Sequence, residues 1–585
     1  MEAGAWRTRV AGVLAGLGTL ALSLALAGSC APTGRTADLV LTNGHVVTAD
    51  DERPEVQAVA VSGHTILDVG SNEEMAAYVG DGTEVVDLQG RLMIPGFIEG
   101  HGHFLSLGRS RMILDLTSAT SWDEIVAMVA AAAERAAPGE WINGRGWHQE
   151  KWTSVPTPNV DGVPLHTALS AVSPDNPVLL GHASGHAAFV NARALEAAGI
   201  DATTADPAGG TIVRDAAGEA TGLLRETAQR LVSGAQARAE SGRSDDERAR
   251  DFAERVRLAG EEALAHGVTS FHDAGSSFAE IEAFRRMDRE GTLPVRLYVM
   301  VRRESNEDMA AHLAEYRVLP EGNGHLTVRA IKRQIDGALG SHGAWLLEPY
   351  EDLPSSTGLV LEDVEEIRRT AEIAIQNGFQ VNTHAIGDRA NREVLDIYED
   401  VFARNPTATD LRWRIEHAQH LHPDDVRRFA DLGVIASMQG VHATSDGPWI
   451  PRRLGEWRSR TGAYLWRSLI DAGVVVTNGT DVPVERIDPV ANFYSSVSRM
   501  TGEGQRFYPD QKMTRMEALR SYTINNAFAE FAEDRKGTIT PGKLADLTVL
   551  SGDLMTLPEE DIPHAKVDLT IVGGEIRYRR PGADR

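Results

Sequence analysis

The chain has 585 residues, of which 42% are hydrophobic and 24% charged, so it is long enough for one large core plus a smaller domain and is not disordered. Its 58 basic and 84 acidic residues give a net charge of −26, which opposes binding to nucleic acid or to anionic lipid surfaces. The single cysteine, Cys30, excludes an intrachain disulfide framework and a thiolate-rich metal site. Any metal chemistry must therefore use histidine and carboxylate ligands.

The first thirty residues predict export. Arg7 and Arg9 precede an apolar stretch over residues 10–27, and small residues then lead to Cys30, as in a secretory signal. The sequence Ala27-Gly-Ser-Cys30 resembles a bacterial lipobox, with alanine where leucine is usual, so we expect a lipoprotein-type signal over residues 1–30 and a lipid anchor on Cys30 in the cell envelope. The alternative is a membrane-spanning anchor, since 18 apolar residues are at the short end of what crosses a bilayer.

Short strands separated by glycine turns occupy both ends of the mature chain. They start near Leu39, Ala58 and Val85 in the amino-terminal part, and near Asp546 and Leu569 in the carboxyl-terminal part. We therefore predict a small β-sandwich domain that combines residues 38–94 with residues 537–585.

The central residues 95–536 repeat a different unit, in which an amphipathic helix ends at a glycine and an apolar strand follows. Helices are predicted from the capping box Ser244-x-x-Glu247 to Gly267, and over 363–376, 424–432 and 465–472. Strands are predicted over 268–272, 379–384, 434–438 and 474–477. This α/β pattern predicts a (β/α)8 TIM barrel, in which the carboxyl ends of the strands form the active face. The long segment 105–240 is predicted to be an insertion at the barrel mouth.

Histidines and one aspartate recur where these strands end. His101 and His103 follow an apolar strand, and residues i and i+2 of a strand project to the same side. A lone His-x-His motif is weak support for a metal site, but His384, His417 and Asp481 also lie at predicted strand ends. Four imidazoles and a carboxylate on one face could enclose two divalent ions.

A series of motifs spans nearly the whole mature chain. They are Pro95-Gly-Phe-Ile-Glu-Gly-His-Gly-His103, Gly144-Arg-Gly-Trp147, Gly185-His-Ala-Ala-Phe-Val-Asn191, Asp336-Gly-Ala-Leu-Gly-Ser341, His384-Ala-Ile-Gly-Asp-Arg389, Glu416-His-Ala-Gln419, Gly479-Thr-Asp-Val-Pro-Val484 and Pro541-Gly-Lys-Leu-Ala-Asp546. With these motifs the sequence resembles the metal-dependent amidohydrolase superfamily, and within it amidohydrolase family 3, the branch that includes N-substituted formamide deformylases.

The resemblance implies a binuclear metal site, with zinc as the expected metal. His101, His103 and Asp481 would hold one ion, and His384 and His417 the other. Lys332 occupies the position where the superfamily often has a lysine that carbon dioxide converts to a bridging carbamate; the alternative is an ordinary ion pair, for instance with Asp336. Hydroxide held between the two ions would attack the acyl carbon, and Asp481, the catalytic residue, would transfer the proton to the leaving nitrogen.

The expected activity is hydrolysis of an amide-like C–N bond outside ordinary peptides, in a small N-acyl or N-formyl substrate. The matched loops contain four candidate substrate-binding residues, each of which could instead pack its loop: Trp147, His186, Asp336 and Gln439. No nucleic acid partner is expected, and membrane contact would occur only through the signal or lipid anchor. A homodimer is compatible with a barrel of this type.

Three other functions are compatible with the same residues. A mononuclear hydrolase would use a subset of the histidines, with Lys332 unmodified. Ester or lactone hydrolysis could use the same nucleophile. A non-catalytic envelope binding protein could retain the barrel as a scaffold, because a fold alone does not establish activity.

Overall fold

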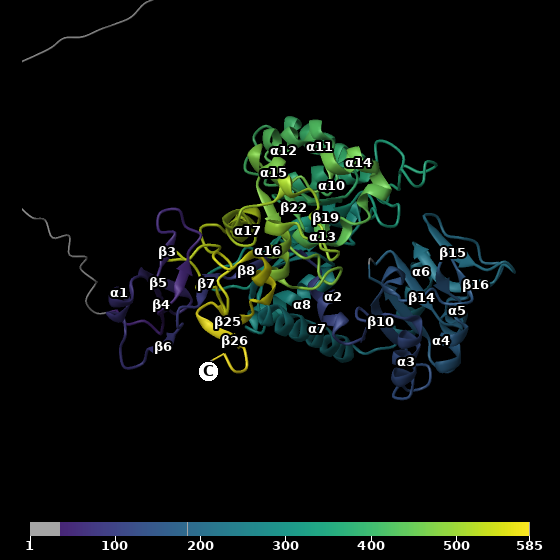
Figure 1. Ribbon diagram of the computed structural model, residues 1–585, viewed down its shortest axis with the longest axis horizontal. Coiled ribbons are helices and arrows are strands. Elements are labelled where there is room, and N and C mark those ends of the chain that lie inside the picture. The colour runs from purple at the N-terminus through teal and green to yellow at the C-terminus, as the bar shows by residue number, and fades with distance from the viewer. Residues whose placement is uncertain (1–34, 184, 584–585) are drawn as a thin grey trace, which may run out of the picture.

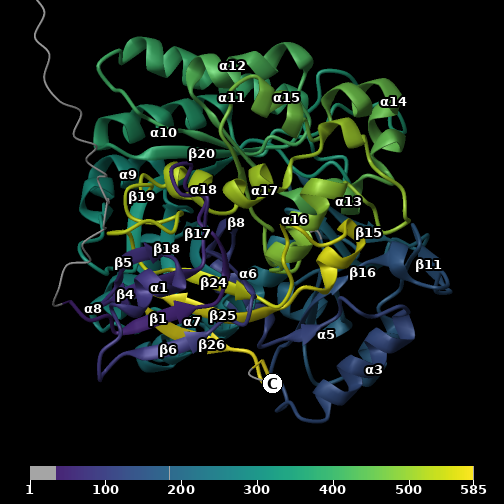
Figure 2. The same ribbon diagram turned by 60° about the vertical axis from the view of Figure 1, so that its left-hand side comes forward.

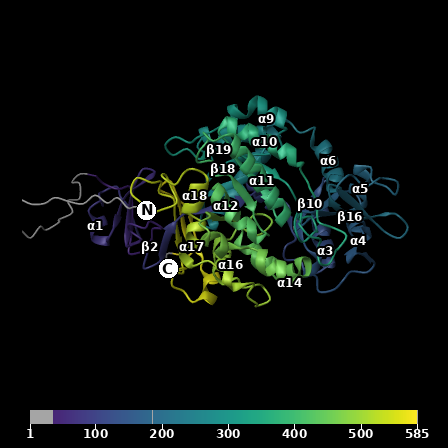
Figure 3. The same ribbon diagram turned by 90° about the horizontal axis from the view of Figure 1, so that it is seen from above.

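The computed structural model of the protein describes residues 35–183 and 185–583. A barrel lies in the middle, a sheet region built from the chain ends lies on one side, and a separate α/β segment lies on the other (Figures 1 and 3). The predicted signal peptide and Cys30 lie outside the described residues. Within the described part, no helix combines the length and the apolar character needed to cross a bilayer.

The central sheet has eight strands, and every neighbouring pair in it is parallel. In spatial order they are β23 (Val476–Asn478), β22 (Ile435–Met438), β21 (Arg414–His417), β20 (Gln380–Ala385), β19 (Leu326–Gln334), β18 (Arg296–Val301), β17 (Val268–Ser276) and β8 (Phe97–Gly102). The two ends of this order meet, because the Asp481 N–H donates to the His101 carbonyl at 2.7 Å and the His103 N–H donates to the Val482 carbonyl at 2.7 Å. The predicted TIM barrel is confirmed.

Helices surround the barrel. They are α2 (Phe104–Ser110), α7 (Asp245–Ala265), α8 (Phe278–Arg289), α9 (Asn306–His312), α10 (Val364–Asn377), α11 (Asp388–Arg404), α12 (Val426–Leu432), α13 (Gly440–Asp446), α14 (Ile450–Gly462), α15 (Trp466–Asp471), α16 (Pro489–Ser498), α17 (Arg515–Ser521) and α18 (Ile524–Ala529). One of them, α13, lies at the barrel mouth, where its His442 ring stacks on that of His417 at 6.2 Å. Ser244 and Glu247 form the predicted capping box of α7, and Gly378 ends α10 with left-handed backbone.

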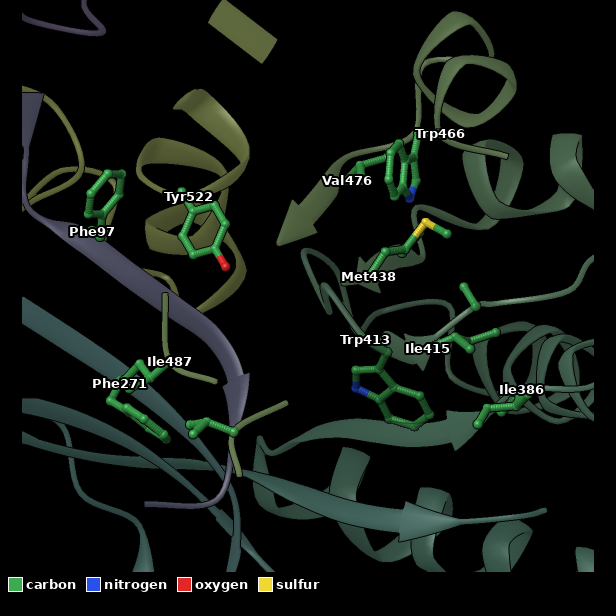
Figure 4. Packing of buried hydrophobic residues seen from close by; sticks show 14 of the residues in the cluster. Phe97, Phe271, Ile386, Trp413, Ile415, Met438, Trp466, Val476, Ile487 and Tyr522 are labelled. Atoms are coloured by element: carbon green, nitrogen blue, oxygen red, sulfur yellow. The ribbon is translucent and has the colours of Figure 1, made fainter. Parts of the chain in front are cut away.

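Large apolar side chains fill the space between the strands and these helices (Figure 4). Phe97 on β8 meets the Tyr522 ring edge-on at 5.8 Å, and Trp413, just before β21, meets Tyr398 of α11 edge-on at 4.9 Å. All four rings are buried. This layer packs against the strands from outside the barrel.

The two ends of the chain build a pair of facing sheets beside the barrel. One sheet has the order β5 (Thr65–Gly70), β4 (Ala58–Ser62), β1 (Leu39–Thr42) and β6 (Glu84–Asp87). The other has the order β26 (Glu575–Arg579), β25 (Val567–Val572), β24 (Leu547–Leu550), β7 (Leu92–Pro95), β2 (His45–Val47) and β3 (Glu55–Val56). Purple amino-terminal and yellow carboxyl-terminal strands lie side by side (Figure 2). A shared buried cluster, which includes Leu41, Val59 and Val549, packs between them.

The segment between α2 and α7 forms its own six-stranded sheet. The spatial order is β15 (Gly210–Arg214), β16 (Ala220–Glu226), β14 (Ala187–Val190), β13 (Val178–His182), β10 (Ile142–Trp147) and β9 (Leu114–Asp115). Four helices accompany it: α3 (Trp122–Ala133), α4 (Thr167–Val172), α5 (Ala192–Ala198) and α6 (Gln229–Glu240). The segment has hydrophobic clusters of its own, and Arg145 on β10 donates to the Pro483 carbonyl of the barrel. It therefore folds beside the barrel and reaches the loop that follows Asp481.

Candidate metal centre

The end of β8 presents two imidazoles to one carboxylate. His101 Nε2 lies 3.6 Å, and His103 Nε2 3.3 Å, from the Asp481 Oδ1 atom. His101 is buried in the strand, whereas His103 is the residue that precedes α2. The alternation of strand side chains brings both rings to the inside of the barrel mouth.

Three consecutive strands across the barrel from β8, namely β19, β20 and β21, add three more groups. Lys332 on β19 places its Nζ atom 3.3 Å from His101 Nε2. His384 near the end of β20 and His417 at the end of β21 meet edge-on, with ring centroids 4.5 Å apart, and the His417 ring lies 4.8 Å from that of His101. The six residues that the sequence nominated as metal ligands are thus gathered at one end of the barrel.

Two of these residues have left-handed backbone. The φ angles of His417 and Asp481 are 75° and 57°, a conformation that side chains with a Cβ atom rarely adopt. Strain of this kind persists where the surrounding structure holds it, and it clusters at functional sites. Here the hydrogen bond from the Asp481 N–H to the His101 carbonyl holds the turn that directs the carboxylate inward.

The chemistry of the donors fits a divalent cation. His101, His417 and Asp481 each offer a ligand atom, and these atoms lie within 4.8 Å of one another. Burial holds the pKa of each histidine well below its usual range, so the rings are neutral and can ligate. Burial alone would raise the pKa of Asp481, but the histidines around it hold that pKa well below its usual range, so the carboxylate is ionised.

Two buried atoms in the centre also lack a well-aligned hydrogen bond within the described part of the chain: Asp481 Oδ1 and His384 Nε2. Buried polar atoms are normally paired, and a cation at this position would satisfy both. Lys332 is buried as well, and this burial lowers its pKa to about 7, far below the value of a lysine in water. The neutral amine that carbamate formation requires is therefore well populated near pH 7.

Glu416 and Arg414 support His101 from inside the barrel, a role that sequence reasoning missed although Glu416 belongs to a quoted motif. The Glu416 carboxylate accepts a short hydrogen bond from His101 Nδ1. Arg414 donates to both oxygens of that carboxylate, at 2.6 and 2.8 Å, and both side chains are fully buried. A carboxylate on Nδ1 fixes the ring so that Nε2 faces Asp481 and Lys332.

Gln439 and Asp336, nominated as substrate contacts, lie behind metal-ligand candidates. Gln439 Oε1 is 2.8 Å from His417 Nδ1, so it orients that ring. Asp336 is fully buried and accepts hydrogen bonds from three peptide N–H groups, those of Trp345, Ile386 and Gly387, at 2.8 to 3.0 Å. Its Oδ1 atom also lies 3.4 Å from His384 Nε2. This placement favours support of His417 and His384 over direct substrate contact.

The remaining two nominated residues, Trp147 and His186, belong to the segment beside the barrel. Trp147 is buried in the core of that segment, and its Nε1 donates to the Leu180 carbonyl at 2.8 Å, which favours a packing role. His186 is half-buried and pairs through Nδ1 with Glu226 at 3.0 Å. Burial lowers the pKa of His384, and His186 contributes to this shift, which links His186 to the candidate metal centre.

Comparison with known proteins agrees with this geometry. Residues 84–578 match the model of the amidohydrolase family. The chain belongs to this family. It is 34% identical over 560 residues to Protein LONG AFTER FAR-RED 3 of Arabidopsis thaliana, and the matched region covers 94% of this chain and 92% of the relative. It is 30% identical over 554 residues to the N-substituted formamide deformylase of Arthrobacter pascens, and this match covers 93% of this chain and 99% of the relative.

A solved structure extends the comparison to three dimensions. A metal-dependent hydrolase from Pyrococcus horikoshii superposes on this amidohydrolase with a TM-score of 0.72 and 28% sequence identity, over 89% of this chain and 99% of the other. Family, fold and donor set therefore agree on a hydrolase of a metal-dependent family.

Proposed function

We propose that this amidohydrolase cleaves a non-peptide C–N bond, such as that of an N-acyl or N-formyl amide. The observation that carries the proposal is the convergence of His101, His103, Lys332, His384, His417 and Asp481 at the carboxyl ends of the barrel strands. The similarity to an N-substituted formamide deformylase supports an amide substrate. A set of imidazoles with a carboxylate suits zinc.

The proposed ligands divide into a convergent set and two flanking residues. His101, His417 and Asp481 are the three groups whose donor atoms already lie close together. His103 and His384 flank this set, beside Asp481 and His417 respectively. We propose that Lys332, once carbamylated by carbon dioxide, completes a site for two ions, because the carbamate changes its charge from +1 to −1 and gives it two acceptor oxygens.

A bound divalent cation would supply Lewis acidity, which lowers the pKa of a coordinated water toward about 7 and polarises the substrate carbonyl. The residues of the chain would supply proton transfer and orientation. Asp481 is ionised, so its carboxylate can accept the proton of the attacking water and return it to the leaving nitrogen. Glu416 and Gln439 would keep the rings of His101 and His417 in their ligating tautomers.

A mononuclear hydrolase is the second candidate, and one observation favours it. Within the described residues, only His101, His417 and Asp481 form a three-ligand group by distance. Three protein ligands with an open position are typical of a one-metal catalytic site. Zinc content per chain separates the candidates, since a value near two supports the carbamate-bridged site and a value near one supports the mononuclear site.

The test uses protein purified with supplemented zinc and a panel of N-formyl amines, N-acetyl amines and cyclic amides, each with a matched ester. We expect amide turnover, and we expect Asp481→Asn to lower kcat by about 10²- to 10⁴-fold because proton transfer is lost. The control is Asp471→Asn, which changes an exposed aspartate on α15. Full turnover by the Asp481→Asn variant, or turnover of esters alone by the wild type, would contradict the proposal.

A further inference from the structure

Arg302, which directly follows β18, continues the series of residues on the inward face of that strand. Tyr298 and Met300 on this strand pack with Ala274 and Ala330 in a buried cluster inside the barrel. Side chains of a strand alternate between its faces, so Arg302, two residues after Met300, belongs to the same face. The Arg302 N–H donates to the Ser276 carbonyl at 2.9 Å, which shows that the ladder with β17 continues to this position.

The next strand places the Arg302 guanidinium relative to the candidate metal centre. Lys332 and Gln334 are two residues apart on β19 and therefore share a face. Lys332 reaches His101, whereas Gln334 lies one step nearer the carboxyl end and pairs in register with His384. Arg302 Nη2 donates to the Gln334 side-chain oxygen at 2.8 Å. The guanidinium therefore lies one layer of side chains above Lys332, in the barrel mouth.

The backbone is shaped to receive this side chain. At Gly275, near the end of β17, an added Cβ atom would lie 2.4 to 2.9 Å from the Cβ, Cγ and Cδ atoms of Arg302. The aliphatic stem of Arg302 thus lies against a position without a side chain, and Arg302 Nη1 is 3.5 Å from the neighbouring Ala274 carbonyl. The stem is held across the strand ends rather than extended into solvent.

The hydrogen-bond partners of Arg302 are neutral. Within the described residues, no carboxylate oxygen lies within 4.0 Å of its guanidinium. Burial lowers the pKa of Arg302 and the charge of Glu362 raises it in part, but the Glu362 carboxylate is paired with another arginine, at 3.9 Å from Arg333 Nε. Arg302 is half-buried and remains charged, because a guanidinium does not lose its proton in proteins. A desolvated guanidinium is normally paired with an anion, and its planar fork matches a carboxylate.

We propose that Arg302 binds a carboxylate of the substrate, so that the preferred substrates are amides that also carry a carboxylate group. Arg145 of β10 adds to the positive field from the neighbouring segment, since its guanidinium donates to the carbonyls of Pro483 and Ala183 and, within the described part of the chain, to no carboxylate. The proposal rests on the proposed function, since the amide would react at the metal centre while its carboxylate is held one layer above it.

The kinetic test compares N-formylglycine with N-formylglycinamide, which differ in charge but hardly in size. We expect the zinc-supplemented wild type to prefer the carboxylate by about ten- to hundredfold in kcat/KM, as for a charge-assisted hydrogen-bonded pair. Arg302→Gln should abolish this preference mainly through KM, and Arg302→Lys should restore part of it, because lysine keeps the charge but not the fork. The control is Arg303→Gln, since Arg303 is exposed and pairs with Glu280.

A binding test needs no turnover. Isothermal titration of the zinc-supplemented protein compares glutarate with hexanoate, which both offer one carboxylate to the metal while only glutarate has a second. We expect glutarate to bind at least about tenfold more tightly in the wild type, and we expect that difference to disappear in Arg302→Gln. Equal binding of the two acids by the wild type, or an unchanged difference in the variant, would overturn the assignment.

The two tests separate this assignment from the proposed function. If glutarate binding depends on Arg302 but no amide is hydrolysed, the anion site stands and the hydrolase proposal fails. If amides are hydrolysed with no charge preference and Arg302→Gln changes neither measurement, the hydrolase proposal stands and the anion site is overturned.

Discussion

The pair of Arg414 and Glu416 behind His101 allows a quantitative prediction. The Glu416 carboxylate takes two bonds from Arg414, at 2.6 and 2.8 Å, and one from His101, and none of the three side chains is more than 1% exposed. Glu416→Gln keeps the shape but removes the charge, so a buried guanidinium loses its counterion. Breaking a buried pair costs about 3–5 kcal/mol, and we expect about 3 kcal/mol here because glutamine still accepts one bond.

The same substitution should weaken metal binding. The amide of glutamine cannot stabilise the His101 ring as a carboxylate does, and loss of such a supporting partner lowers metal affinity by about 10- to 100-fold. Urea denaturation measures the change in the free energy of unfolding, and competition with a chromophoric chelator measures the zinc dissociation constant of the folded variant. The control is Glu365→Gln, since the Glu365 side chain is 76% exposed and lies 3.4 Å from Arg368; we expect a change within about 0.5 kcal/mol.

Two results would refute this reasoning. A folded Glu416→Gln variant whose zinc affinity stays within about twofold of the wild type would show that Glu416 does not orient His101 for ligation. A free energy of unfolding equal to that of the Glu365→Gln control would show that Arg414 does not need its counterion.

Two further predictions follow from the site. Burial lowers the pKa of Lys332 to about 7, and only the neutral amine reacts with carbon dioxide. The rate of carbamate formation at constant dissolved carbon dioxide should therefore rise about tenfold from pH 6 to pH 8 and then level off. ¹³C NMR with labelled carbon dioxide measures this rate, and a rise that continues to pH 10 would indicate an ordinary lysine. Gly479→Ala should lower the free energy of unfolding by about 1–3 kcal/mol in urea denaturation, because the new Cβ atom would lie 2.5 Å from the His101 backbone nitrogen and 2.6 Å from Glu99 Oε1. The control is Gly502→Ala, which adds a Cβ atom in open space and should change this free energy very little. Equal stability of the two variants would contradict this account of barrel closure.

Local sequence patterns predicted many of the barrel elements within one or two residues. The helix expected over 363–376 runs from Val364 to Asn377, and the strand expected over 434–438 runs from Ile435 to Met438. These elements could be predicted because their caps, glycine stops and apolar periodicity all lie within a few residues of one another. The strand expected over 268–272 continues to Ser276, because its carboxyl end pairs with β18 rather than ending at a local stop.

The partners of the site residues could not be read from local patterns. Glu416 and His101 are 315 residues apart, and Gln439, which follows β22, is 22 residues from His417 at the end of β21. Which side chains meet depends on the register of the strands around the barrel, and a shift of one residue would turn each side chain to the other face. The support of His101 by Glu416, and the placement of Arg302 above Lys332, therefore emerge only in the folded chain.

Residue type and periodicity are local properties, so the kinds of chemical group available and the strand ends that carry them can be predicted from the order of the residues alone. Which groups touch depends on the folded chain: it joins Asp481 to His101 across the closure of the barrel and gives Arg302 neutral hydrogen-bond partners. Barrel closure and strand register are set by packing over the whole chain, and the contacts between distant residues follow from them.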